Sequence, residues 1–133
     1  MIRRATEADF LRILTIAVSS YREFDIENAY LWGVKSLENP DIAIWVGDHT
    51  FGVSGVSAPF YAPAKRRGVM LFLAAEPRAG YEPCKMLRTM IEWCLNERGA
   101  TSFHLGEDTG VNLAPLAKRV GATKDRDSYT LKL

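Results

Sequence analysis

The apolar run GVMLFLAA, at residues 68–75, constrains the fold of this chain more than any other stretch. A short run without polar side chains is typical of a β-strand that is buried on both faces, so we expect it near the centre of a sheet. The turn EPRAGYEP follows it, and the pattern beyond predicts a helix that ends at Arg98 and Gly99. The apolar residues that mark this helix recur at helical spacing: Leu87, Met90, Ile91, Cys94 and Leu95.

Two helices are predicted before this strand. Apolar residues spaced as on one helical face run from Phe10 to Tyr21, and Thr6 precedes them as an N-cap, which predicts a helix over residues 7–21. The second helix should end before Pro40, because the residue before a proline avoids helical backbone angles. Its expected buried side comprises Ile26, Ala29, Tyr30, Val34 and Leu37.

The remaining segments predict strands and one short helix. An antiparallel pair is expected over residues 42–47 and 50–60, and a short helix over 113–120 is closed by Gly121. The other predicted strands are residues 2–5, residues 100–106 and the alternating end of the chain at Tyr129, Leu131 and Leu133. The order β-α-α-β-β-β-α-β-α-β, without repeats or linkers, predicts one mixed α/β domain.

Composition argues against partners that are recruited by charge or by a bilayer. Seventeen basic residues against sixteen acidic ones give a net charge of +1, so nucleic acid is not expected, and the basic cluster 65–67 is interpreted as a solvated hairpin tip. The apolar runs are far shorter than the ~20 residues that cross a membrane, and the first residues show no secretory signal, which favours a cytoplasmic protein. Cys84 and Cys94 lie on one predicted helix, about 15 Å apart along its axis, so they are not expected to form a disulfide with each other. With only two cysteines and two histidines, no metal site is expected.

At this point three stretches carry a resemblance to a known family. They are the opening IRRATEADFLRIL, the central strand that leads through an arginine-containing turn into a helix, and the closing unit NLAPLAKRVGATKDRDSYTL. Together they resemble the GNAT superfamily of acyl-CoA N-acyltransferases over nearly the whole chain, residues 1–133. The resemblance implies an α/β (α+β) fold, with a mixed, mostly antiparallel twisted sheet of about six to seven strands and about four flanking helices. It also implies that acyl-CoA enters where residues 69–75 and 101–106 splay apart.

The family's pyrophosphate loop, Arg-x-x-Gly-x-Gly/Ala, matches this chain only in part. With Arg78 on the motif's arginine, Tyr81 and Pro83 take its two glycine positions, while Gly80 keeps one flexible point. Pro83 removes an N–H donor and Glu82 adds negative charge where a phosphate would sit, although both also begin a helix well. The contacts to acetyl-CoA that the resemblance implies are Leu73, Ala75, Arg78, Ala79, Gly80, Tyr81 and Asn112.

The family's general acid is a tyrosine four residues before a glycine on the last helix, and the matching position here is Ala117. General acid–base catalysis contributes about 10²- to 10⁴-fold, so acyl transfer by proximity remains an option. His104 alternates with Phe103 and Leu105 and so points away from their face, as either a base or a structural histidine. The residues that could replace the missing tyrosine are Tyr81, His104, Glu107, Asp108 and Tyr129.

Two functions therefore remain open. The first is an acetyltransferase that passes an acyl group from acetyl-CoA, or from another acyl-CoA, to a small-molecule or protein amine, with a homodimer or a larger assembly as an option. The second is a GNAT-fold binding or structural module without transferase activity. The closing unit around Gly121 also resembles internal virion proteins of some short-tailed phages, which would place such a module in a virion.

Overall fold

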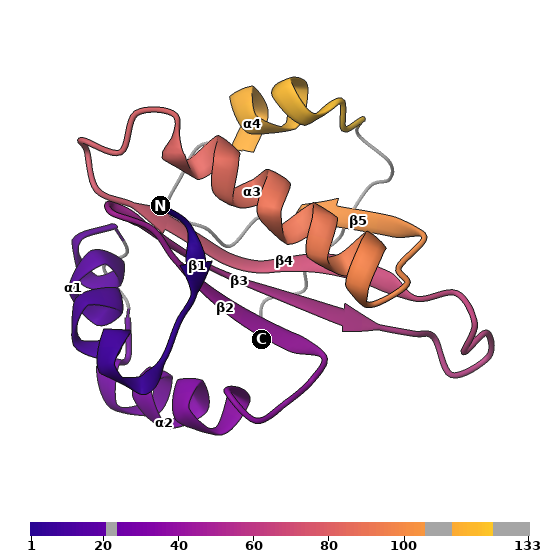
Figure 1. The fold of residues 1–133 in the computed structure, drawn as a ribbon, viewed down its shortest axis with the longest axis horizontal. Coiled ribbons are helices and arrows are strands. Elements are labelled where there is room, and N and C mark those ends of the chain that lie inside the picture. The colour runs from indigo at the N-terminus through magenta and orange to yellow at the C-terminus, as the bar shows by residue number, and fades with distance from the viewer. Residues whose placement is uncertain (21–23, 106–112, 124–133) are drawn as a thin grey trace, which may run out of the picture.

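The computed structural model describes residues 1–20, 24–105 and 113–123, and Figure 1 shows their arrangement. These residues form a five-stranded sheet in the order β1-β2-β3-β4-β5. The first four strands are antiparallel to their neighbours, and β5 runs parallel to β4. The strands are β1 (Arg3–Arg4), β2 (Ile42–Val46), β3 (Thr50–Ser57), β4 (Arg67–Ala75) and β5 (Ser102–Leu105). The apolar run thus lies inside the sheet as predicted, and the predicted last strand falls outside the described residues.

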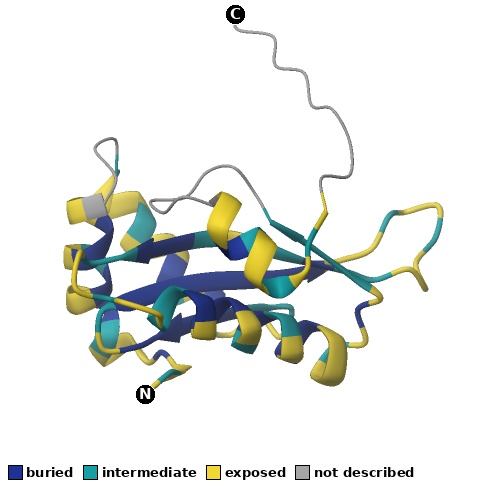
Figure 2. Cartoon of the chain, turned by 90° about the horizontal axis from the view of Figure 1, so that it is seen from above, coloured by how far each residue is buried: buried dark blue, intermediate teal, exposed yellow. Residues whose placement is uncertain are grey.

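Helices cover both faces of the sheet. Helices α1 and α2 lie on one face and α3 on the other, with α4 beside α3 (Figures 1 and 2). The first helical turn is a 3₁₀ turn, Glu7–Asp9, that continues into α1. The bounds are α1 (Phe10–Ser20), α2 (Ile26–Ser36), α3 (Glu82–Glu92) with a π-helical turn (Trp93–Glu97), and α4 (Leu113–Val120). None of the described helices is long and apolar enough to cross a bilayer.

The two faces of the sheet form separate cores. Along β2, Ala43 and Trp45 pack with α3, whereas Ile44 and Val46 pack with α1, because alternate side chains of a strand point to opposite faces. The α3 side is packed so closely that glycine is needed in the sheet. A Cβ atom at Gly68 would lie 2.7 Å from the Cβ atom of Cys94.

Two predicted helix faces need correction. Ile26, at the start of α2, is 51% exposed and Tyr30 is 38% exposed, while Gly33 is buried beneath the ring of Phe10. The start of α2 therefore stands away from the sheet. Leu95, at the end of the α3 pattern, is also exposed. The π-helical turn adds a residue to that turn, so the apolar spacing no longer keeps one face.

The expected solvated tip at residues 65–67 is also wrong in one respect. The guanidinium of Arg66 donates to the carboxylate of Asp41 at 2.9 Å, and Arg98 donates to the same oxygen at 2.7 Å. Both arginines hold the pKa of Asp41 below its ordinary value, the hydrogen bond from Arg98 most strongly. Arg66 thus ties the β3–β4 hairpin to the start of β2 and to the end of the α3 helix.

Strand β4 contains a β-bulge, where its register with β3 shifts by one residue. Val53 pairs with Phe72 but Ser54 pairs with Met70, so Leu71 is the extra residue. The register with β5 ends at the pair Met70–Leu105, immediately before this bulge, whereas β3 accompanies β4 to Ala75. Bulges bend a strand and are common beside active sites. The described part of β5 ends at Leu105, so the expected splay between residues 69–75 and 101–106 stays a prediction.

Candidate functional site

The loop between β4 and α3, residues 76–81, is named here the arginine loop. Its turn is closed by a hydrogen bond from Ala79 N–H to the Glu76 carbonyl at 3.0 Å, and Gly80 adopts a φ of 59°, which favours glycine. The backbone N–H groups of Gly80, Tyr81 and Cys84 have no hydrogen-bond acceptor among the described residues. Free N–H groups at a helix N-terminus attract anions, so the loop suits a phosphate despite its missing glycines.

The carboxylate of Glu82 has a different role from the expected one. It accepts hydrogen bonds from the N–H of His49 at 2.7 Å and of Asp48 at 3.1 Å, in the turn between β2 and β3. Gly47 leaves room for it, since a Cβ atom there would lie 2.6 Å from its Oε1. The negative charge of Glu82 is thereby compensated by backbone dipoles of another element. Glu82 therefore attaches the start of α3 to the β2–β3 turn, and it is not an unpaired charge that opposes a phosphate.

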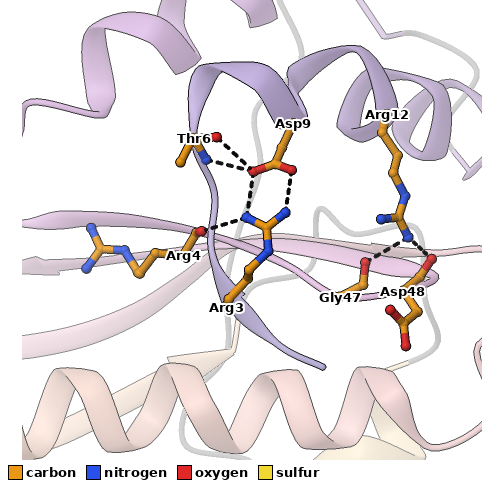
Figure 3. Close-up of polar contacts among 7 residues, drawn as sticks. All are labelled: Arg3, Arg4, Thr6, Asp9, Arg12, Gly47 and Asp48. Atoms are coloured by element: carbon orange, nitrogen blue, oxygen red, sulfur yellow. Dashed lines mark hydrogen bonds and ion pairs between the residues drawn. The ribbon is translucent and has the colours of Figure 1, made fainter.

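The β2–β3 turn is also attached to two other parts of the molecule. The guanidinium of Arg12 donates to the carbonyls of Gly47, at 2.9 Å, and of Asp48 (Figure 3). On its other side, His49 Nδ1 lies 3.0 Å from Glu76 Oε2 in the arginine loop. The turn thus connects α1 to the arginine loop and holds the loop in place.

Figure 3 also shows the cap of α1. Arg3 donates to both carboxylate oxygens of Asp9, at 2.7 and 2.8 Å, and the backbone N–H of Thr6 donates to the same carboxylate at 2.8 Å. The hydrogen bonds from Arg3 and then from Thr6 hold the pKa of Asp9 well below its usual range. This group fixes the first helix against β1.

A cavity of about 260 Å³ lies between the arginine loop and α4, and is named here the loop pocket. The guanidinium of Arg119 lies 4.8 Å from the centre of the Tyr81 ring, across this pocket. Arg78 is exposed and has no ion pair within the described residues. The lining residues are Gly80, Tyr81, Pro83, Cys84, Pro115, Leu116 and Arg119. Arg119 and the three residues that carry the free N–H groups therefore border one cavity, while Arg78 lies in the same loop outside its lining.

A second cavity, of about 310 Å³, lies on the opposite face of the sheet and is named here the apolar pocket. Leu71 and Phe72 of β4, the bulge residue and its neighbour, form one wall, and α1 and α2 form the others. Its described lining carries no charged side chain. The lining residues are Phe10, Ile13, Leu14, Phe24, Ala29, Tyr30, Trp32, Gly33, Ile44, Phe51, Val53, Leu71 and Phe72.

The proposed catalytic residues fall on different sides of the sheet. Tyr81 belongs to the loop pocket. Phe103 and Leu105 pack into the core under α3, so His104 projects from the opposite face, which is the face of the apolar pocket. It pairs in register with Val69, and its Nε2 lies 3.4 Å from the hydroxyl of Ser102. The other candidates, Glu107, Asp108 and Tyr129, lie outside the described residues.

The residues expected to contact acetyl-CoA do not all lie together. Arg78, Ala79, Gly80 and Tyr81 come together in the arginine loop. The side chain of Leu73 is fully buried in the core under α3, and Ala75 ends β4. Asn112 lies outside the described residues. Within the described ranges no group of three metal-binding side chains occurs.

Sequence reasoning missed the apolar pocket and the role of Glu82. The aromatic residues of the pocket come from α1, α2, β3, β4 and the segment before α2, so no local spacing reveals them. The available signal was the pair of apolar residues at the start of α2, Ile26 and Tyr30, whose spacing was also typical of an ordinary buried face; only the structure shows that they are exposed.

No protein-family model matches this sequence, and comparison with curated proteins gives no significant match. Solved structures, in contrast, match it over its whole length. A candidate acetyltransferase of Agrobacterium tumefaciens is 14% identical, with a TM-score of 0.80, over 100% of this chain and 99% of that one. A predicted acetyltransferase of Clostridium acetobutylicum, whose structure includes acetyl-CoA, is 15% identical, with a TM-score of 0.75, over 99% and 95%.

A third similar structure is glucosamine-6-phosphate N-acetyltransferase of Arabidopsis thaliana. It is 15% identical, with a TM-score of 0.68, over 99% of this chain and 97% of that one. At such identities the likeness establishes the fold. The chain has the GNAT fold, as the resemblance of its sequence predicted.

Proposed function

We propose that this protein is an acetyl-CoA-dependent N-acetyltransferase. The observation that carries the proposal is the pair of pockets on opposite faces of the sheet, one at the bulge of β4 and the other at the loop that follows this strand. One pocket offers a guanidinium and free N–H groups, and the other offers apolar surface. Two substrates of different chemistry, one anionic and one apolar, would fit such a pair. The similarity to solved acetyltransferases supports the same assignment.

The residues around the arginine loop fit the phosphates of acetyl-CoA. Gly80, Tyr81 and Cys84 contribute N–H groups at the positive end of the α3 dipole, and Arg78 and Arg119 contribute charge. Pro83 contributes no donor. We therefore assign phosphate binding to this loop and the loop pocket, with Glu82 as a residue that positions the loop.

When bound, acetyl-CoA supplies an acetyl group held as a thioester, which a neutral amine takes up to give the N-acetyl amine and free CoA thiol. This chain's contribution is chiefly to orient the amine, since proximity alone can supply a large part of such a rate enhancement. We assign His104 as the group that accepts the proton the amine gives up, because it lies on the face of the apolar pocket. With Ala117 in place of a tyrosine, the described part of α4 offers no phenolic acid.

Titration with acetyl-CoA, followed by calorimetry and by thermal unfolding, tests the proposal. A ligand at 100 times its Kd stabilises the folded state by roughly 2.7 kcal/mol, which is easily measured. Arg78→Ala should weaken the binding, whereas Arg88→Ala, an exposed arginine on α3 away from the loop, should not. No binding at millimolar acetyl-CoA would overturn the proposal and favour a GNAT-fold binding module.

A further inference from the structure

We infer that the acceptor is an amine with an aromatic or bulky apolar body, which the apolar pocket binds. The inference rests on the proposed function for the transfer step, but the pocket's preference can be measured without acetyl-CoA. It names a substrate class for the face of the sheet opposite the arginine loop.

The lining of the apolar pocket is the first argument. Phe51 and Phe72 are stacked with ring centres 5.3 Å apart, and the ring of Phe24 lies 5.9 Å from that of Phe72. On the helical side, Phe10 and Tyr30 meet edge to face at 5.8 Å. Aromatic rings prefer these geometries with one another, so a flat aromatic ligand finds matching partners there.

The polar atoms at the pocket provide the second argument. The hydroxyl of Tyr30 donates to the carboxylate of the exposed residue Glu7 at 3.2 Å, so it is already occupied outside the cavity. The described lining contains no carboxylate that could bind several ammonium groups or a sugar's hydroxyls. Burying such groups without hydrogen bonds is costly, and this excludes polyamines and amino sugars from the cavity.

Size and position complete the argument. An apolar cavity of about 150 Å³ suffices for benzene in a well-studied protein, so about 310 Å³ suits a fused ring or a phenyl ring with a short chain. Leu71 at the bulge lines the cavity and directly follows Met70, which pairs with the last described residue of β5. A short chain from a ring in the pocket would therefore lead its amine toward the splay. Partial desolvation there also lowers the pKa of an ammonium group and favours the neutral nucleophile.

The test compares tryptamine and 2-phenylethylamine with spermidine and glucosamine 6-phosphate, by calorimetry in the absence of acetyl-CoA. We expect the aromatic amines to bind at least tenfold more tightly. With acetyl-CoA added, mass spectrometry should detect their N-acetyl products at least tenfold faster than those of the polar amines. Equal or reversed preferences in the binding experiment would overturn the inference.

Variants locate the binding. Ala29→Phe should fill the pocket and weaken tryptamine binding at least tenfold, while leaving stabilisation by acetyl-CoA unchanged. Lys35→Phe is the matched control, because Lys35 is exposed on the same helix and does not line the pocket. Should Ala29→Phe fold poorly, Trp32→Ala removes one aromatic wall and should also weaken binding. Unchanged affinity in the folded variants would contradict the site.

Failure of this inference differs from failure of the proposed function. If acetyl-CoA binds but aromatic amines do not, the acceptor class is wrong and the transferase assignment stands. If aromatic amines bind but acetyl-CoA does not, the transferase assignment falls, and the acceptor role inferred for the pocket falls with it.

Discussion

The two faces of the sheet differ in how closely helices pack on them. Under α3 there is no room for a Cβ atom at Gly52 or Gly68, because Met90 and Cys94 occupy that space. Under α1 and α2 the packing leaves a cavity of about 310 Å³. Figure 2 shows the buried strands between these layers. The contrast teaches that the face under α3 leaves no space for added side-chain atoms, whereas the open face can accommodate a ligand.

The largest expected effect comes from introducing a leucine on each face and comparing the two losses in the free energy of unfolding. Gly68→Leu forces side-chain atoms into Cys94 and Phe103, and we expect a loss of about 3 kcal/mol in the free energy of unfolding. Ala29→Leu, which extends into the apolar pocket, should change it by less than about 1 kcal/mol. Urea unfolding measures both values. Equal losses would show that the cavity is closed in solution.

Glu82→Ala tests whether this residue supports the arginine loop. Removing the acceptor of two backbone N–H groups should cost about 1–2 kcal/mol of stability and weaken acetyl-CoA binding, because the β2–β3 turn no longer holds the loop. A residue that merely repelled phosphate would give tighter binding when removed. Glu92→Ala, an exposed acid on the same helix, is the control. Calorimetry with acetyl-CoA distinguishes the two outcomes.

The cap of α1 predicts a pH dependence on the open face. The folded-state pKa of Asp9 is depressed, so its stabilisation is complete above the ordinary carboxyl pKa of about 4 and is lost as pH falls through the folded value. Asp9→Asn should cost about 1 kcal/mol at pH 7, with a difference from the parent protein that shrinks below pH ~4. Thermal unfolding at several pH values measures this. A difference that stays constant down to pH ~2 would contradict it.

The smallest expected effect concerns Arg119. Its guanidinium faces the Tyr81 ring at the rim of the loop pocket, so Arg119→Ala should raise the Kd for acetyl-CoA by about two- to fivefold. The affinity for tryptamine, bound on the other face, should not change. Lys118→Ala, its exposed neighbour, serves as the control. A parallel loss of tryptamine affinity would show that the two faces are coupled.

Local patterns in the sequence predicted most of the elements. The apolar run of β4, the proline after α2 and the glycines after α3 and α4 each specify backbone geometry within a few residues. Such signals act between near neighbours, so they can be recognised without knowing the fold. The partial match of the pyrophosphate motif at Arg78 and Gly80 falls in the loop between β4 and α3, and its role in phosphate binding stays a prediction.

The sequence by itself therefore determined which segments are strands and helices, and that a loop with part of the pyrophosphate motif joins a strand to a helix. Only the tertiary structure decided that Glu82 binds a turn more than thirty residues earlier in the chain, and that aromatic residues from several elements enclose one cavity. The physical reason is that these contacts join residues distant in sequence, whose meeting depends on how the helices pack on the sheet. From its place in the sequence, the negative charge of Glu82 was expected to oppose phosphate binding. In the folded protein, Glu82 instead supports the loop to which we assign phosphate binding.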